Sequence, residues 1–295
     1  MDRFAGIALE LGALAGASCA PAPERSVAGG SISECYAWRC DAALLFVKVA
    51  PRAALGAFEA EAAGLAALAG PQALRVPRVI ACGCTAAEAF LALEWIDAGA
   101  ADARCEERLG RGLAAIHAVT AMRFGLETDN RIGRTPQLNG WSSDWTGFFR
   151  ERRLRPQLQL AAQRGFGALL DEAGARLLEA LPALLAGHRP TPSLLHGDLW
   201  GGNWFASRDG DPVIFDPAVY YGDREADLAM TGLFGGFGGP FYRAYRAAAP
   251  LASGWQSRAE LYNLYHVLNH ANLFGGGYPR QARAMIERLL AEVRG

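Results

Sequence analysis

Hydrophobic and polar residues are arranged differently in the two parts of the chain. Through the first hundred residues, short apolar runs end at turn residues, a pattern that is typical of strands. Between these runs lies one segment in which apolar residues recur at helical spacing, and it ends at Gly70-Pro71. We therefore predict a helix over residues 54–69. The predicted strands cover residues 26–33, 35–39, 43–49, 76–82 and 89–96.

After residue 97 the apolar residues recur mainly at helical spacing. The predicted helices cover residues 104–119, 144–160, 172–185 and most of the chain from 224 onwards, with a short β-rich stretch at 194–205 and 212–215. We therefore predict an α+β fold with a small strand-rich N-terminal lobe over residues 1–97 and a larger helical lobe over residues 98–295. A functional site is expected in a cleft between these lobes.

The N-terminal segment admits two interpretations. Residues 4–20 are apolar enough for a signal peptide, and Cys19 after Gly-Ala-Ser is similar to a lipoprotein cleavage site. Glu10 interrupts that run, however, and the larger apolar residues share one face of a helix, so we predict a short N-terminal helix. No apolar run elsewhere reaches the roughly 18–20 residues of a membrane span.

Composition narrows the class of protein. The 295 residues carry 29 basic and 30 acidic side chains, and this balance argues against nucleic acid or an anionic membrane as the main partner. The six cysteines have no framework spacing, and Cys82-Gly-Cys84 lacks a second pair for zinc, so we expect neither disulfides nor a metal there. We expect a reduced, soluble, cytoplasmic protein.

One basic residue stands apart from the others. Lys48 is the only lysine of the chain, and it lies inside an apolar predicted strand, where an unpaired ammonium is costly to bury. In the helix that follows, Glu61 falls on the apolar stripe whereas Glu59 points elsewhere. Protein kinases hold the α- and β-phosphates of ATP with such a pair of strand lysine and helix glutamate. A purely structural ion pair is the alternative.

A second group of polar residues follows in the helical lobe. His196-Gly197-Asp198 leads to Asn203, and Asp216 ends a short apolar run. The Asp-x4-Asn spacing matches the kinase catalytic loop, in which the aspartate accepts the proton of the acceptor hydroxyl. An amide oxygen and a second carboxylate are hard ligands that suit Mg²⁺. We therefore predict Asp198 as the catalytic base, and Asn203 with Asp216 as the metal ligands.

With these motifs in place, the chain resembles the fructosamine kinases (ketosamine 3-kinases), which are related to aminoglycoside phosphotransferases and choline kinases. The resemblance covers nearly the whole chain. HGD with D-x4-N marks the wider superfamily, and three longer segments narrow it to fructosamine kinases. These segments are DNRIGRTPQ at 129–137, WTGFFRERRLRPQ at 145–157 and YYGDREADLAM at 220–230. One departure is Gly201, where the family usually has serine.

The resemblance implies a two-lobed, protein-kinase-like fold and adds residues to the nucleotide site. Lys48 and Glu61 would position the phosphates beneath a glycine loop at Gly29, Gly30 and Ser31, although the third glycine of GxGxxG is missing. The backbone of the hinge between the lobes would meet adenine. This hinge runs from Leu93 to Ile96, with Glu94, Trp95 and Ile96 as the expected nucleotide contacts.

Acceptor residues are expected near the end of the chain. The predicted helix around residues 262–273 carries His266, Asn269 and His270 away from its apolar side, and the resemblance places this helix at the acceptor pocket. We predict that His270 and Asn269 contact the sugar and that Trp200 stacks on its apolar face. A solvated helix face and a core tryptophan are the alternatives.

Several other polar residues have expected structural roles. Asp227 would brace the backbone of the catalytic loop, and Arg224 with Glu225 would form a pair that closes this loop. His117 is expected in the core, and Cys35 is a candidate for oxidation. A solvated helix face is expected for Arg150, Arg152, Arg153 and Arg155.

We therefore predict an ATP- and Mg²⁺-dependent kinase for a small acceptor, since residues 216–224 leave no room for a peptide-binding activation segment. By the resemblance, the acceptor is a sugar hydroxyl of a ketosamine, such as the fructosamine or ribulosamine on a glycated lysine or amine, and the reaction serves protein deglycation. The alternatives are a kinase for an aminoglycoside or choline and a non-catalytic nucleotide-binding pseudokinase. The sequence does not indicate the oligomeric state.

Overall fold

The structure is a computed structural model that describes residues 3–28 and 33–293. The chain divides into two compact units, of which the first comprises Met1–Cys105 with Trp204–Pro217 and the second Glu106–Asn203 with Ala218–Gly295. Residues 204–217 thus belong to the first unit, although their place in the sequence groups them with the later helices. Backbone hydrogen bonds from Ile214 to Arg75 (3.1 Å) and from Gly99 to Ala206 (2.7 Å) hold this segment there.

A five-stranded antiparallel sheet forms the centre of the first unit. Its strand order is β1-β2-β3-β5-β4. The strands are β1 (Arg25–Val27), β2 (Glu34–Cys40), β3 (Ala43–Pro51), β4 (Val79–Cys84) and β5 (Glu88–Glu94). The last four confirm predicted strands with slightly shifted ends, and β1 begins the strand predicted over 26–33.

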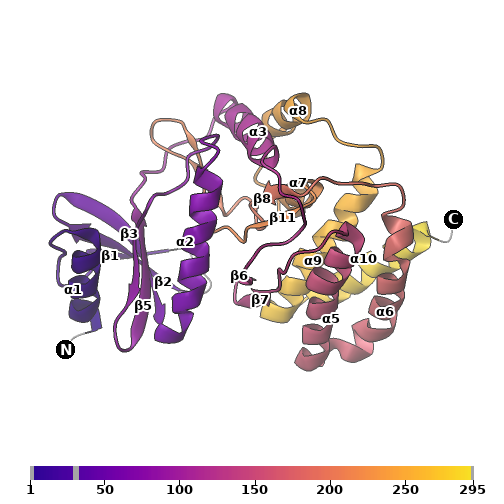
Figure 1. Ribbon diagram of the computed structural model, residues 1–295, viewed down its shortest axis with the longest axis horizontal. Coiled ribbons are helices and arrows are strands. Elements are labelled where there is room, and N and C mark those ends of the chain that lie inside the picture. Colours follow the sequence, from indigo (N-terminus) through magenta and orange to yellow (C-terminus); the bar gives the residue numbers. More distant parts are fainter. Residues whose placement is uncertain (1–2, 29–32, 294–295) are drawn as a thin grey trace. The chain divides into compact units, whose positions relative to one another are not determined.

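Two helices cover opposite faces of this sheet, α1 (Arg3–Ala15) and, after the short turn η1 (Arg52–Ala54), α2 (Leu55–Ala69) (Figure 1). The predicted helices at the N-terminus and over 54–69 are thereby confirmed. Successive residues of a strand point to opposite faces. In β3, Val47 packs with Ile7 in the core beneath α1, and Ala50 packs with Phe58 in the core beneath α2. Lys48, two residues before Ala50, therefore lies on the α2 side of the sheet.

Cys19 and Cys40 form a disulfide, so the expectation of a chain without disulfides is wrong. The segment around Cys19 runs antiparallel to the end of β2, where the Ala20 N–H donates to the Arg39 carbonyl at 2.8 Å. This pairing brings the two thiols together although 21 positions separate them in the sequence. A contact made by tertiary folding leaves no signal in the cysteine spacing.

Helices form most of the second unit, and α3 begins in the first unit and continues into the second. They are α3 (Ala103–His117), α4 (Trp145–Phe148), α5 (Arg155–Ala161), α6 (Gly167–Leu184), α7 (Glu225–Leu233), α8 (Gly239–Ala248), α9 (Trp255–Phe274) and α10 (Tyr278–Glu292). Two π-helical turns, η2 (Phe149–Leu154) and η3 (Ala162–Phe166), flank α5. Helix α10 packs against α9 and α6, and α7 against α9, around one core that includes Trp145, Leu177 and Leu268 (Figure 1).

Three two-stranded antiparallel pairs complete the described structure. They are β6 (Asn130–Ile132) with β7 (Thr135–Gln137), β8 (Ser193–Leu195) with β11 (Tyr220–Gly222), and β9 (Trp204–Ala206) with β10 (Pro212–Ile214). The first two pairs belong to the second unit and the third to the first unit. Strand β8 leads directly into residues 196–203, and β11 is followed by α7.

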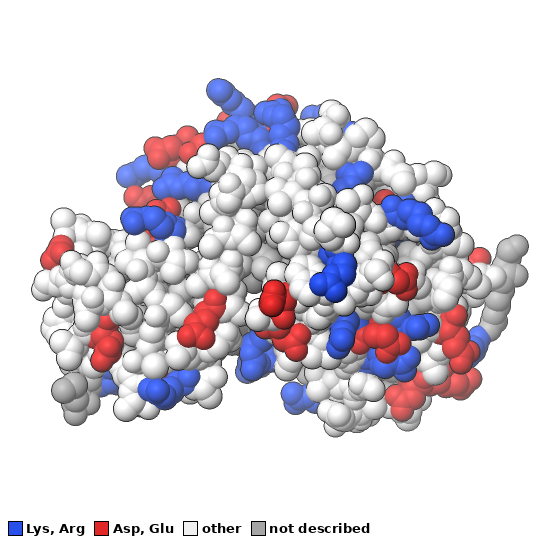
Figure 2. Space-filling view, viewed as in Figure 1, with Lys and Arg blue, Asp and Glu red and all other residues white. Residues whose placement is uncertain are grey.

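Charged side chains of both signs occur over the face drawn in Figure 2. This mixture agrees with the near-zero net charge of the sequence. Among residues 3–28 and 33–293, no helix combines the length and the hydrophobicity that a bilayer span requires.

Candidate active site

Lys48, Glu61 and Asp216 form an ion cluster in the first unit. Lys48 Nζ lies 2.7 Å from Glu61 Oε1 on α2, so the structure contains the contact predicted between these two residues. Lys48 Nζ also donates to Asp216 Oδ1, which follows directly after β10. Because Lys48 is only 7% exposed, both carboxylates neutralise an ammonium that is largely removed from water.

In this cluster one cation faces two carboxylates. Burial lowers the pKa of Lys48, but the charges of Glu61 and Asp216 outweigh burial and hold that pKa above its usual value. Burial raises the pKa of Glu61 to about 7, with the charge of Asp216 acting in the same direction and Lys48 opposing both. The cluster is therefore short of positive charge, and a further cation beside Asp216 would relieve the repulsion between the carboxylates.

Asp216 has an unusual backbone conformation. Its φ of 55° lies in the left-handed region, which only a few per cent of non-glycine residues adopt. Such conformations cost about 1 kcal/mol or more and are concentrated at functional sites. The Asp216 side chain is 35% exposed, so its carboxylate remains accessible while it holds Lys48.

In the second unit, β8 leads into the loop that carries Asp198. The Asn203 amide donates to the backbone carbonyl of Asp198 at 2.8 Å and to its carboxylate Oδ2 at 3.2 Å. Gly197 has a φ of +82° and lies so close to the backbone of Ala218 that a side chain would not fit. The structure therefore brings Asp198 and Asn203 together in a tightly constrained loop.

Asp227 on α7 holds the backbone of the same loop through its side-chain carboxylate. Asp227 Oδ2 accepts from the His196 N–H at 2.7 Å, and Oδ1 accepts from the Gly197 N–H at 2.9 Å. His117 Nε2 lies 3.1 Å from Asp227 Oδ2, and His117 Nδ1 lies 2.7 Å from the Tyr245 hydroxyl. Burial raises the pKa of Asp227, but His117 and the other partners outweigh burial and lower it. These contacts agree with the expected roles of Asp227 and His117.

Arg224 and Glu225 do not pair with each other, so the expected ion pair between them is wrong. Glu225 accepts hydrogen bonds of 2.7 and 2.9 Å from Arg258, and Arg224 donates to the Tyr245 hydroxyl at 3.1 Å. Successive residues at a helix start point about 100° apart. The two side chains therefore leave the start of α7 in different directions.

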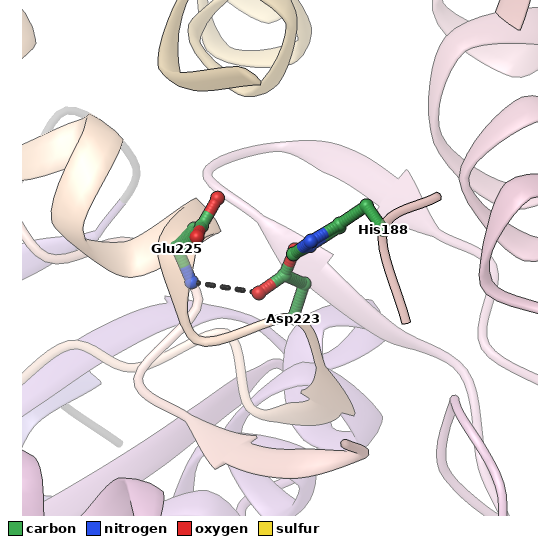
Figure 3. Close-up of side chains that lie close together, drawn as sticks. All are labelled: His188, Asp223 and Glu225. Carbon is green, nitrogen blue, oxygen red and sulfur yellow. Dashed lines mark hydrogen bonds and ion pairs between the residues drawn. The ribbon is translucent and has the colours of Figure 1, made fainter. Parts of the chain in front are cut away.

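His188, Asp223 and Glu225 bring three possible metal ligands within 4.8 Å of one another (Figure 3). All three already have hydrogen-bond partners. His188 Nε2 lies 2.5 Å from Asp223 Oδ2, and the Tyr262 hydroxyl donates to the same oxygen at 2.6 Å. Because a metal ion would have to displace these bonds and the Arg258–Glu225 pair, we interpret the group as a structural network.

The predicted nucleotide residues are described in part. Gly29, Gly30 and Ser31 lie outside the described residues. Glu94 ends β5, and its N–H donates to the Arg78 carbonyl at 2.9 Å. The Trp95 indole donates to Asp97 Oδ1 at 2.9 Å, and the guanidinium of Arg25 lies 5.1 Å from the Trp95 ring centre. The predicted hinge residues 94–96 therefore start at the last residue of β5 and follow it directly in the chain.

The predicted acceptor residues fall into two groups in the second unit. The ring centres of Trp200 and Phe234 lie 6.1 Å apart, and those of Phe234 and His270 lie 4.8 Å apart. Asn269, by contrast, is buried and accepts a hydrogen bond from Gln157 at 3.4 Å. The structure thus links Trp200 and His270 through Phe234, whereas the side chain of Asn269 is buried against Gln157.

A buried hydrogen-bond network also reaches the catalytic loop, and it starts from the segment 129–137, whose pattern marked the family but gave these residues no role. Gln137 donates to Asn130 Oδ1 at 2.9 Å and to the Ala218 carbonyl at 3.0 Å, and it accepts from the Tyr265 hydroxyl at 2.8 Å. The Ala218 N–H donates to the His196 carbonyl at 2.8 Å. Gln137 is therefore linked to the catalytic loop through a single residue.

Arg153 belongs to the same buried region, so the expectation of a solvated face is wrong for this arginine. Its guanidinium donates to Asn139 Oδ1 at 2.9 Å and lies 4.0 Å from the ring centre of Tyr220 and 4.7 Å from that of Phe148. Aromatic rings and an amide oxygen thus replace water around a fully buried cation. In the π-helical turn η2, Arg153 and Leu154 are buried, whereas Glu151 and Arg152 stay exposed.

The fold defines the class of protein. A spectinomycin phosphotransferase, solved in complex with ADP and spectinomycin, matches with a TM-score of 0.56 and 14% identity over 96% of this chain and 93% of that chain. A putative fructosamine-3-kinase from Haemophilus somnus matches with a TM-score of 0.88 and 28% identity over 97% of both chains. The chain therefore has the α+β, protein-kinase-like fold of small-molecule phosphotransferases.

Sequence comparison specifies the family within this class. The fructosamine kinase family model matches residues 5–292. A probable ketoamine kinase of Synechocystis is 47% identical over 267 residues, which are 90% of each chain. A chloroplastic protein-ribulosamine 3-kinase of Oryza sativa is 41% identical over 268 residues, which are 90% of this chain and 78% of that protein. The chain belongs to the fructosamine kinase family.

Proposed function

We propose that the protein is an ATP- and Mg²⁺-dependent kinase that phosphorylates a sugar hydroxyl of ketosamines. Membership of the fructosamine kinase family supports this proposal, as do relatives named ketoamine kinase and ribulosamine 3-kinase. The observation that carries it is the position of Asp198, which Asn203 contacts inside a loop held by Asp227. A positioned carboxylate of this kind is what the activation of an acceptor hydroxyl requires.

The donor set fits a magnesium–nucleotide complex. Asp216 and Asn203 each offer an oxygen of the hard type that Mg²⁺ prefers, and the cluster around Asp216 is short of positive charge. In the proposed function these two residues would hold Mg²⁺, which neutralises phosphate charge when bound. Lys48, oriented by Glu61, would bind the α- and β-phosphates.

Asp198 would accept the proton of the acceptor hydroxyl as that oxygen attacks the γ-phosphorus of ATP. The bond between the γ-phosphorus and the bridging oxygen breaks, and ADP leaves with the bond electrons. For a ketosamine, the expected acceptor is the 3-hydroxyl of the sugar. Trp200 would stack on the sugar, and His270 would contact it from α9.

An acceptor screen tests the substrate class. ADP release is measured with fructosyl-lysine, ribulosyl-lysine, choline and kanamycin at equal concentrations, and the position of the new phosphate is determined by NMR. We expect turnover with the two ketosamines and phosphorylation of the 3-hydroxyl. Preferred turnover of choline or kanamycin, or no turnover with any acceptor, would contradict the proposal.

The role of Asp198 is tested by Asp198→Asn, which keeps the side-chain size but removes the proton acceptor. We expect kcat to fall by about a hundredfold or more, while ATP binding measured by calorimetry stays within about twofold. Asp209→Asn, at an exposed turn, is the matched control and should leave both quantities unchanged. Near-normal turnover by Asp198→Asn would show that another group accepts the proton.

A further inference from the structure

Four ring side chains form a partly exposed aromatic surface in the second unit. They are Trp200, Phe234, His270 and Phe274, hereafter the aromatic surface. The ring-centre distances are 6.1 Å for Trp200–Phe234, 4.8 Å for Phe234–His270 and 5.4 Å for His270–Phe274. Trp200, Phe234 and Phe274 remain 39%, 38% and 53% exposed, so part of each ring is open to a ligand.

A close backbone contact holds this surface against the catalytic loop. A side chain at Gly201 would lie 2.9 Å from the Gly235 carbonyl and 3.0 Å from Gly236 Cα, so the two loops touch through glycines. Phe234, which precedes Gly235, is thereby kept beside Trp200, two residues after Asp198.

The segments that carry the aromatic surface are uncharged in sequence, and the Glu106 carboxylate lies close to one of them, at Gly238. The segments 199–203, 233–239 and 266–279 contain no aspartate, glutamate, lysine or arginine. Burial lowers the pKa of His270 and so favours its neutral form. A ligand group that covers the surface meets ring faces and edges, which favour apolar groups and tolerate an ammonium through cation–π attraction.

We propose that Phe234 and Phe274, the part of the aromatic surface beyond the sugar-contacting Trp200 and His270, bind the amine substituent of the ketosamine acceptor and give the enzyme a preference for adducts of apolar and aromatic amines. This inference rests on the proposed function. A ketosamine carries its amine on C1, two carbons from the 3-hydroxyl that Asp198 would activate, so the substituent must leave the sugar close to the catalytic loop. The aromatic surface begins at this loop with Trp200 and continues outward through Phe234 to Phe274.

The preference can be measured with fructose adducts of methylamine, butylamine and benzylamine, which share the sugar and the amine but differ in the substituent. In the wild type, kcat/KM should rise about tenfold from the methyl to the benzyl adduct. Phe234→Ala and Phe274→Ala should each lower kcat/KM for the benzyl adduct about fivefold. The same variants should change kcat/KM for the methyl adduct, and the KM for ATP, by less than about twofold.

Met122→Ala is the control because this side chain is 95% exposed and lies outside the aromatic surface; it should keep the wild-type gradient. Equal kcat/KM for the three adducts in the wild type, or equal losses for all three in the phenylalanine variants, would overturn the inference. Calorimetry with the same adducts separates it from the proposed function. Absence of phosphorylation contradicts the proposed function, whereas equal dissociation constants for the methyl and benzyl adducts overturn the role of the aromatic surface.

Discussion

Glu61→Gln tests the charge balance of the ion cluster with one substitution. The Glu61 carboxylate shares Lys48 with Asp216, and burial together with this second carboxylate raises the pKa of Glu61 to about 7. The glutamine keeps the size of the side chain and an oxygen that can face Lys48, but it removes one of the two negative charges. The variant therefore isolates the effect of the excess carboxylate.

The expected magnitude follows from the two pKa values of Glu61. Between its usual value of 4.5 and about 7, the folded protein retains a proton that the unfolded chain has released. The stability that this proton contributes is fully present below pH 4.5 and is lost as the pH rises through about 7. The difference corresponds to about 3 kcal/mol of unfolding free energy, with little screening because the side chain is 16% exposed.

The assay is denaturant unfolding at pH values from 5.0 to 8.5 and constant ionic strength, followed by tryptophan fluorescence. Relative to Glu61→Gln, the wild type should lose about 2–3 kcal/mol over this range. Glu59→Gln, on the exposed side of the same helix, should follow the wild-type curve. If Glu61→Gln and the wild type keep a constant difference at every pH, the shared-lysine explanation is refuted.

Three further substitutions have defined expected outcomes. Lys48→Arg should lower kcat/KM for ATP at least about tenfold, because a planar guanidinium cannot take the place of the compact ammonium that contacts both carboxylates of the cluster. Unchanged ATP kinetics would contradict this explanation. Gln137→Leu should lower kcat about tenfold and leave the KM for ATP within about twofold, because it removes the hydrogen bond to Ala218 beside the catalytic loop. A loss of folded protein in proportion to the loss of kcat would instead indicate a structural role. Cys19→Ser should lower the unfolding free energy by about 3 kcal/mol in denaturant titrations, and a reductant should then destabilise only the wild type; equal stability of the two proteins would count against a stabilising disulfide.

Local patterns in the sequence were sufficient for most elements and for two parts of the candidate site. The alternation of side chains along β3 places Lys48 on the face of the sheet that α2 covers, and the helical period of α2 places Glu61 on the side that faces this sheet. The structure contains the contact between the two residues. The five-residue spacing of Asp198 and Asn203 keeps both in one loop, where they are hydrogen-bonded. In each case the geometry depends on a few neighbouring residues, so the sequence determines it directly.

Contacts between distant segments were decided by the tertiary structure. The hairpin of β9 and β10 carries Asp216 to Lys48 across 168 positions, and the segment before β1 brings Cys19 to Cys40. Arg153, expected in solvent, is buried in the π-helical turn η2, where it contacts Asn139 and Tyr220 from distant segments. Each of these contacts depends on how whole elements pack and on which loops close, and this information is spread over many residues rather than held in a short motif. The sequence by itself therefore determined the elements and the chemistry they carry, whereas only the packing of those elements decided which charges, thiols and rings meet.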